Sequence, residues 1–405
     1  MGPVTMKRGL EEILERRIIV CVGTGGVGKT TMAAALALQA ARRGQRALVV
    51  TIDPAKRLAG ALGLKTLDHK PQTLDIETSA ALGVPENGRL SAMMLDIPST
   101  FDGLVERFAE NAEARERILA NPIYHQVSTT LAGSGEYAAM EKVFELLENT
   151  DFDLIVLDTP PAQNAVDFLD APHRLLEFID SRLVRLLIQP AFAAGRTGFR
   201  WLRGPTVRML DLLERLVGLG FLRDLSEFLI AFEAMAEGFR ERAHSVRQTL
   251  LGPESAFVLI AGASRQTSRN AEAFLKHIDG KKLPLAGIII NRIRLWDSVA
   301  ARRSDDFEWI EPGPTEIETL EEALQAAHPQ LDAGRMTRSA IQVARQYTAW
   351  VKLDWQNTAA IRTAATERGL FLAPVAERPE DVHDAIELGR MTEELFGHAV
   401  PDSTQ

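Results

Sequence analysis

The sequence predicts an α/β fold in which a doubly wound, mainly parallel sheet carries helices on both faces. Short runs rich in β-branched residues alternate with longer segments of helical periodicity. Several runs are almost continuously apolar, which is typical of strands that helices bury on both faces. We expect strands at residues 17–22, 46–52, 90–95, 152–157, 256–261, 286–290 and 369–372. Because ligands of such sheets bind beyond the carboxyl ends of the strands, the loops after these runs are candidate sites.

The composition is that of an ordinary globular protein. The chain has 405 residues, of which 46% are hydrophobic and 25% are charged, and these values exclude a mainly disordered protein. Cys21 is the single cysteine, so the chain has neither an internal disulfide nor a cysteine pair that holds a metal. The formal net charge of −9 argues against a broad surface for nucleic acid, which is therefore not an expected partner.

The sequence gives no sign of export or membrane insertion. It contains no run of about eighteen apolar residues, and residues 1–17 carry charges where a signal peptide needs an apolar core. An unpaired cysteine also fits a reducing compartment. We therefore expect a cytoplasmic protein.

Two long stretches between the expected strands have helical character. In residues 181–250, Leu, Met and Phe recur at three- and four-residue spacing and glycines interrupt the pattern, which predicts several helices. Residues 315–367 form a second helix-rich stretch before the last expected strand. The expected organisation is a core in two parts, residues 1–180 and 251–405, with a helical insertion at residues 181–250.

A phosphate-binding loop follows the first expected strand. Residues 23–31 read GTGGVGKTT and match the pattern G-x-x-x-x-G-K-[ST] between a strand and a helix. Its glycines allow backbone N–H groups to converge on a phosphate at the helix N-terminus. Lys29 offers positive charge to the β- and γ-phosphates, and Thr30 offers its hydroxyl to Mg²⁺. The residues assigned to this site are Gly25, Gly26, Val27, Gly28, Lys29, Thr30 and Thr31.

Acidic residues follow two of the other expected strands. Asp53 comes directly after the second strand, and Asp158 follows the fourth. A carboxylate at the end of an apolar strand is the Walker B arrangement, in which the acid reaches the magnesium shell of a bound nucleotide. The alternative is that both carboxylates only cap helices.

Together these segments resemble the ArsA/Get ATPases, a branch of the SIMIBI class of P-loop NTPases. GTGGVGKTT, IDPAKRLAGALG and LDTPPAQNAVDFLDAP are similar, in this order, to the phosphate loop, switch I and switch II of that family. The segment LAGSGEY at residues 131–137 looks like one found in bacterial members. The resemblance implies a P-loop NTPase core with a helical insertion, ATP or ADP and Mg²⁺ as cofactors, and a dimer across the nucleotide face.

The resemblance also implies roles for single residues. Asp53 falls on the switch I aspartate that positions the attacking water, and Asp158 falls on the switch II aspartate near the metal. Asp53 and Lys29 are thus the expected catalytic residues, and Thr30, Asp53 and Asp158 the expected metal site. The adenine-reading asparagine matches Asn291, although an asparagine after a strand is more often a turn residue. The pair beside the base matches Pro374 and Val375.

The chain departs from the family pattern at three places. Thr24 occupies the position of a lysine that in the family reaches the partner's nucleotide, so ATPase activity is expected to be weak or dependent on a partner. Asn164 stands where switch II often has a histidine. With a single cysteine, the chain has neither the zinc-holding CxxC nor an arsenite-binding set of thiolates. Soft metals need several thiolates. We expect no zinc and no arsenite, and a homodimer or a heterodimer with a paralogous ATPase.

The helical insertion leaves the function open. Its Met, Leu and Phe residues between 209 and 239 could line a groove for a hydrophobic helical client or a membrane-protein partner, or they could simply pack on each other. The favoured function is an ATPase whose nucleotide state gates this region. One alternative is a nucleotide-gated scaffold with negligible hydrolysis. Another is a positioning ATPase of the ParA/MinD type.

Overall fold

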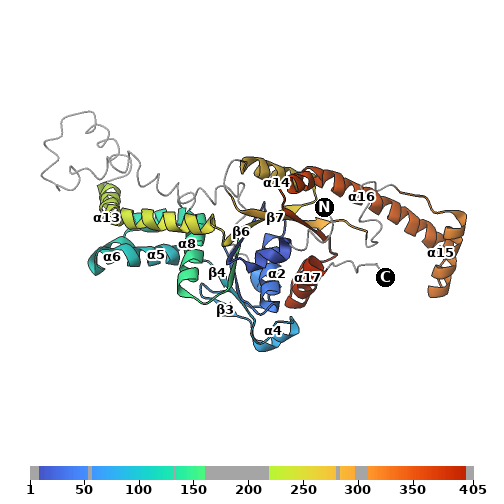
Figure 1. The fold of residues 1–405 in the computed structure, drawn as a ribbon, viewed down its shortest axis with the longest axis horizontal. Helices are drawn as coiled ribbons and strands as arrows, with labels where there is room; N and C mark the ends of the chain where they lie inside the picture. Colours follow the sequence, from blue (N-terminus) through green and yellow to red (C-terminus); the bar gives the residue numbers. More distant parts are fainter. Residues whose placement is uncertain are drawn as a thin grey trace.

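The computed structural model has an eight-stranded sheet at its centre, with strand order β3-β4-β2-β5-β1-β6-β7-β8 (Figure 1). The structure describes residues 9–52, 57–130, 134–159, 219–279, 283–296 and 309–397. All strand pairs are parallel except the pair of β3 and β4, which is antiparallel. The expected doubly wound, mainly parallel sheet is thereby confirmed.

The strands lie close to the expected runs. They are β1 (Ile18–Val22), β2 (Arg46–Thr51), β3 (Gln72–Thr73), β4 (Arg89–Met94), β5 (Leu154–Asp158), β6 (Ser255–Gly262), β7 (Leu285–Ile293) and β8 (Phe371–Ala376). Two differences stand out. The edge strand β3 has only two residues and was not expected, and β8 begins two residues later than predicted. The second difference arises because Gly369, at a φ of 66°, and Leu370 still donate hydrogen bonds to the last turn of the preceding helix.

Successive residues of the central strands point to opposite faces of the sheet, and each face carries its own hydrophobic cluster. Ile18 and Val20 belong to one cluster, whereas Ile19 and Cys21 belong to the other. The second face is covered mainly by α2 (Lys29–Arg42) and α17 (Ala385–Gly397), as well as the short α3 (Arg57–Ala61). The first face is covered by α8 (Ser134–Asn149), α14 (Arg265–His277) and the long helices described below. Two short helices complete this part, η1 (Ile13–Glu15) and α4 (Ile76–Ala81).

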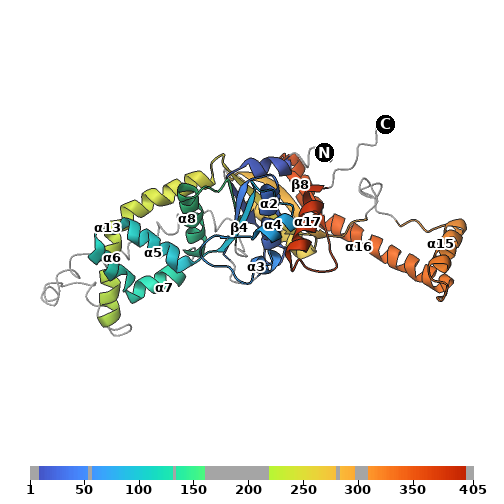
Figure 2. The same ribbon diagram turned by 90° about the horizontal axis from the view of Figure 1, so that it is seen from below.

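Helices from two parts of the chain pack together at one end of the molecule (Figures 1 and 2). They are α5 (Ile97–Phe108), α6 (Ala112–Leu119), α7 (Pro122–Thr130), α8 and α13 (Leu219–Leu250). The expected helical character of residues 181–250 is confirmed for α13, whereas residues 160–218 lie outside the described residues. The sequence placed α5 to α8 in the first part of the core, but they join α13 in this helical end.

A helical hairpin extends from the opposite end of the molecule (Figures 1 and 2). Its helices are α15 (Pro314–Ala327) and α16 (Ala333–Glu367), so the helix-rich stretch expected at residues 315–367 is confirmed. With 35 residues, α16 is about 52 Å long. Its C-terminal part packs on the sheet and α14, and its N-terminal part carries α15 away from the core.

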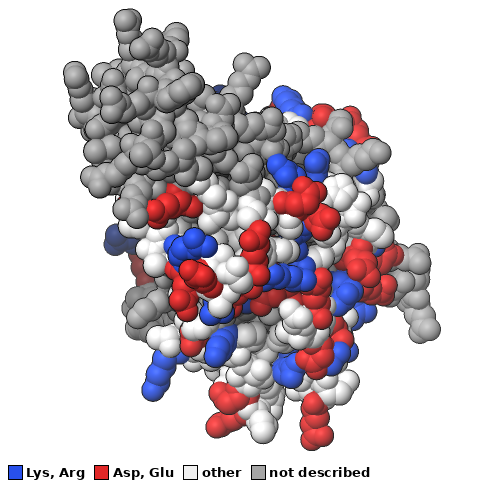
Figure 3. All heavy atoms as spheres, turned by 90° about the vertical axis from the view of Figure 1, so that its left-hand side faces the viewer, with Lys and Arg blue, Asp and Glu red and all other residues white. Residues whose placement is uncertain are grey.

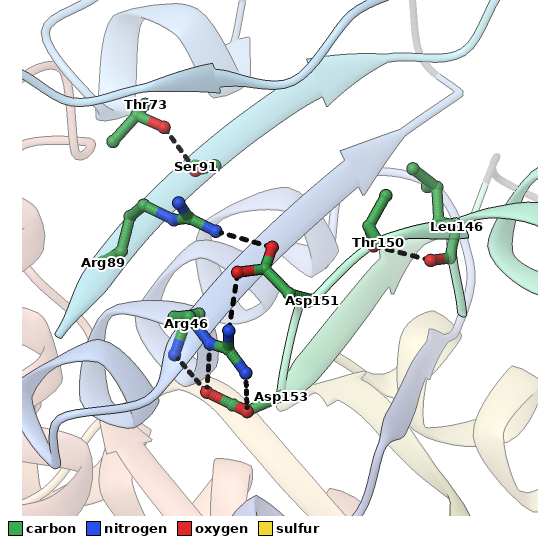
Figure 4. Close-up of polar contacts among 8 residues, drawn as sticks. All are labelled: Arg46, Thr73, Arg89, Ser91, Leu146, Thr150, Asp151 and Asp153. Atoms are coloured by element: carbon green, nitrogen blue, oxygen red, sulfur yellow. Dashed lines mark hydrogen bonds and ion pairs between the residues drawn. The ribbon is translucent and has the colours of Figure 1, made fainter. Parts of the chain in front are cut away.

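An ionic cluster ties the amino ends of three neighbouring strands together (Figure 4). The Arg46 guanidinium lies 2.6 Å from Asp151 and 2.8 Å from Asp153, and Arg89 lies 3.1 Å from Asp151. These side chains are partly exposed, so each pair contributes little to stability. They lie at the end of the sheet opposite to the loops that the sequence singled out.

The surface of the helical end is mixed in charge. Figure 3 shows basic and acidic side chains interspersed over the described part of this face, rather than gathered into the basic stripe expected of a nucleic-acid-binding face. Among the helices that the structure describes, none combines the length and the apolar character needed to cross a bilayer.

Candidate nucleotide site

The phosphate loop joins β1 to α2 in the predicted strand–loop–helix order. Gly28 is the N-cap residue of α2 and, like Gly26, has a positive φ, at 89° and 77° respectively. A Cβ on Gly28 would lie 2.3 Å from Asn291 Nδ2. Glycine is therefore needed at position 28 both for its backbone conformation and for the close approach of a neighbouring side chain.

Lys29 bends back over the phosphate loop. Its side chain belongs to the first turn of α2, and its Nζ donates a hydrogen bond of 3.0 Å to the carbonyl oxygen of Thr24. The residue is only 7% exposed. The ammonium group is thus held next to the helix N-terminus, where the loop amides favour an anion.

Asp158 is the centre of a small polar cluster behind the phosphate loop. Its Oδ2 accepts hydrogen bonds from Thr30 Oγ1 at 2.7 Å and from Thr51 Oγ1 at 2.9 Å. The residue lies at the end of β5, opposite Thr51 at the end of β2, and is 2% exposed. Parallel strands that end at the same edge bring these oxygens together. Hydroxyl and carboxylate oxygens are ligands that Mg²⁺ prefers, so the cluster fits the expected metal.

Cys21 lies beside this cluster but plays a structural part. It pairs with Asp158 in the register of β1 and β5, and its backbone oxygen accepts a 2.7 Å hydrogen bond from Thr159 Oγ1. Burial raises the pKa of the Cys21 thiol well above its ordinary value, and the negative charge of Asp158 adds to this. The thiol therefore stays protonated at neutral pH, and Cys21 acts as a small apolar residue of the core.

Asn291 braces the phosphate loop from the neighbouring half of the sheet. It lies near the end of β7, is 3% exposed and donates from Nδ2 to the carbonyl oxygen of Val27 at 2.9 Å. Its Oδ1 accepts a 3.0 Å hydrogen bond from the N–H of Arg292, whose φ is 57°. The structure thus assigns this amide a loop-bracing role that the sequence did not reveal. Its contact with adenine stays a prediction.

Pro374 and Val375, the other described residues of the predicted site, lie in β8 beside β7. Pro374 is opposite Ile290 in the pairing of β7 and β8, so it lies at the same corner as Asn291. Pro374 is partly exposed, whereas Val375 is fully buried in the core. Asp53 lies outside the described residues, as does Asn164.

Thr51 is the member of the Asp158 cluster that sequence reasoning missed. It is the last residue of β2 and stands two positions before the predicted switch I aspartate, Asp53. The signal for Thr51 is a hydroxyl residue at the end of a strand that lies beside the strand of Asp158. This signal can be used only when the strand order is known.

Three large apolar residues of the predicted insertion are core residues in the structure. Phe228, Met235 and Phe239 of α13 are at most 2% exposed. The ring of Phe239 lies 5.6 Å from that of Phe108 in α5, centroid to centroid. For these residues the packing alternative fits better than a client groove, and the residues at 209–218 lie outside the described part of the chain.

A buried ionic cluster fastens α13 to α8. Arg242 donates from Nε to Glu141 and from Nη1 to Glu148, both at 2.7 Å, and its guanidinium lies 4.2 Å from the ring centre of Phe144. The side chains of Arg242 and Glu141 are 5% and 4% exposed. Burial raises the pKa of Glu141 to about 7, and Arg242 only partly opposes this. Because α8 leads directly into β5, this cluster connects the helical end to the strand that carries Asp158.

The sequence matches the family model described as anion-transporting ATPase, of the ArsA type, over residues 16–303. The chain belongs to the ArsA ATPase family. The match includes β1 to β7 and every described residue of the site except the two in β8. This confirms the family and the P-loop core that the sequence motifs indicated.

Similar curated proteins carry related names. An uncharacterized protein of Streptomyces coelicolor is 33% identical over 181 residues, which cover 44% of this chain and 42% of that protein. The ATPase get3 of Schizosaccharomyces japonicus is 23% identical over 297 residues, covering 72% of this chain and 79% of that protein. The arsenical pump-driving ATPase of Escherichia coli is 30% identical over 165 residues, covering 39% and 26%. The chain thus spans less than half of several relatives that it matches.

Proposed function

We propose that this family member binds MgATP at the phosphate loop and hydrolyses it to ADP and phosphate. The observation that carries the proposal is the pair of hydrogen bonds that joins Asp158 to Thr30 and Thr51 directly behind the loop. This cluster combines a Walker A hydroxyl with a Walker B carboxylate, the combination that P-loop NTPases use around their metal. The names of the relatives, several of them ATPases, support the same activity.

The residues divide the work in a simple way. The loop amides and Lys29 hold the phosphates, and Thr30 and Asp158 hold Mg²⁺, which neutralises charge on the β- and γ-phosphates when it is bound. Thr51 fixes the orientation of the Asp158 carboxylate through its hydroxyl. Asp53 positions the attacking water, as the family resemblance implies. Asn291, with Pro374 and Val375, receives the adenine.

Nucleotide state would reach the helical end along the chain itself. Asp158 ends β5, the segment predicted as switch II follows it, and the chain returns in α13. The buried Arg242 and Glu141 pair ties α13 to α8, which precedes β5. Both α8 and α13 of the helical end are therefore connected to β5, the strand that carries Asp158. We propose that a hydrophobic helical client or a partner protein binds there, in the cytoplasm.

Two questions about partners follow from Thr24. A second copy of this chain lacks the lysine that would reach its neighbour's nucleotide, and a paralogous subunit is the alternative source of such a lysine. This substitution is also the observation that favours the second candidate, a nucleotide-gated scaffold with negligible hydrolysis. Membership of the ArsA family favours both the ATPase and the scaffold over a ParA/MinD-type positioning ATPase.

Phosphate release from MgATP tests the proposal. The rate is measured for the wild type, Asp53→Asn and Lys29→Ala, and nucleotide binding is measured for each. An active wild type with an inactive Asp53→Asn that still binds ATP supports the enzyme. Equal, near-zero rates with intact ATP binding support the scaffold. Absence of ATP binding to the wild type contradicts both.

A further inference from the structure

The hairpin opposite the helical end carries a surface that no other described part of the chain covers. We call residues 309–353, which include α15 and the N-terminal part of α16, the arm. In Figures 1 and 2 the arm projects beyond the sheet. No residue of α15 is buried, and its main packing partner is α16. A helix of this length is marginal in water without a buried face, so α15 would gain stability from a partner.

Exposed apolar side chains concentrate on the arm. Of the nine large hydrophobic residues that are exposed in the described part of the chain, six belong to it. These six are Ile310, Leu320, Leu331, Val343, Trp350 and Leu353. Such residues need no explanation when they stand singly, but six on one projecting element make the arm a candidate interaction surface.

The two helices of the arm carry opposite charges. Between its ends, α15 has four glutamates and no basic residue. From Ala333 to Leu353, α16 has Arg335, Arg338, Arg345 and Lys352 and no acidic residue. Arg338, Arg345 and Lys352 follow at seven-residue spacing, which places them in one stripe along the helix. The arm is therefore acidic on one helix and basic on the other.

We propose that the arm binds the arm of a second copy of this chain, with α15 of each copy against α16 of the other. A two-fold axis presents the same surface twice, so it suits a surface that is complementary to itself. An acidic helix beside a basic helix has this property, because each helix meets its opposite in the partner. Val343 and Trp350 lie roughly half a turn around α16 from this basic stripe, so charge rather than apolar area carries the pairing.

The size of the arm sets the expected affinity. Its face is about 30 Å long and about 20 Å wide, the width of two helices, which gives roughly 600 Å² per copy. This is somewhat less than the roughly 800 Å² per partner of standard interfaces. We therefore expect a dimer in the micromolar range that weakens as salt is added. The contact needs no nucleotide, so it is independent of a dimer across the nucleotide face.

Charge reversal tests the pairing. Sedimentation velocity of the nucleotide-free full chain is measured from about 1 to 100 μM. The acidic-helix variant Glu318→Lys with Glu322→Lys changes two exposed residues of α15, and the basic-helix variant Arg338→Glu with Lys352→Glu changes two of α16. Each variant places like charges on both sides of the axis, so the dissociation constant should rise about tenfold or more. Mixing the two variants should restore a dimer, as should all four changes in one chain.

A matched control and an independent readout guard against misfolding. Glu77→Lys with Glu86→Lys makes the same charge change at exposed residues near α4 and should leave the dimer intact. ATP binding should be equal in all variants, since no change lies near the phosphate loop. A wild type that stays monomeric up to 100 μM overturns the proposal. So does a dimer that resists both reversals, or four combined changes that fail to restore association.

Discussion

Replacing the buried Glu141 by glutamine should change how the stability of the protein depends on pH. Burial raises the pKa of this carboxyl from 4.5 to about 7 in the folded protein. A raised carboxyl pKa means that the folded state binds the proton more tightly, so stability is gained at low pH and lost as pH rises towards 7. A shift of this size corresponds to roughly 2.5 kcal/mol between pH 5 and pH 8.

Glutamine imitates the protonated carboxyl at every pH. At pH 5 we expect Glu141→Gln and the wild type to have similar free energies of unfolding. At pH 8 the variant should be the more stable by roughly 2 kcal/mol, because only the wild type then buries an ionised carboxylate. Urea unfolding followed by circular dichroism measures this as a midpoint difference of roughly 0.5 M, because the dependence of stability on urea steepens with chain length.

Glu148 supplies a control of opposite sign on the same helix. Burial would raise the pKa of Glu148, but the hydrogen bond and charge of Arg242 outweigh it and lower the pKa. Its contribution is therefore present at neutral pH and lost in acid. Glu148→Gln should be less stable than the wild type at pH 8, and the gap should narrow as pH falls. A difference between Glu141→Gln and wild type that is constant from pH 5 to pH 8 would refute the reasoning.

Three more substitutions test the phosphate loop and the far end of the sheet. Gly28→Ala places a Cβ against Asn291 in a left-handed conformation; calorimetry should show ATP affinity at least about tenfold lower. Unchanged affinity would contradict the close fit. Asn291→Ala removes the hydrogen bond to Val27 and should lower the free energy of unfolding by about 1 kcal/mol, whereas an unaltered urea midpoint would show that the brace is dispensable. Arg46→Ala breaks two partly exposed ion pairs and should leave ATP affinity as in the wild type; a weaker affinity would mean that this end of the sheet acts on the site.

The sequence predicted the sheet well because its strands are short, apolar and bounded by turns. Isolated β-branched runs such as residues 46–52 leave few alternatives to a buried strand. The two residues of β3 carry no pattern of this kind, since they pair only at one edge of the sheet. The start of β8 was misplaced because the left-handed turn at Gly369 extends the end of α16.

Site residues that belong to one contiguous motif could be predicted from the sequence. Residues that meet only through the fold could not. Lys29 and Thr30 belong to a contiguous pattern, and Asp158 follows an evident strand. Thr51 joins Asp158 only because β2 and β5 are neighbours, a fact of strand order. The bond from Asn291 to Val27 spans 264 positions, and no local pattern signals such a contact.

The packing of α5 to α8 on α13 was missed for a similar reason. Each helix shows an apolar face, but the sequence does not say which other face covers it. In the structure the aromatic ring of Phe108 in α5 packs against that of Phe239 in α13. These two helices come from parts of the chain that are far apart in sequence. Residues 181–250 alone therefore account for only part of the helical end.

Binding of ATP in the presence of Mg²⁺ to the wild type and to Lys29→Ala tests the central claim most directly. Isothermal titration calorimetry should show one site per chain for the wild type. Loss of the ammonium held over the loop should weaken binding about 10- to 100-fold. Equal affinities for the two proteins would contradict the assignment of this loop as the nucleotide site.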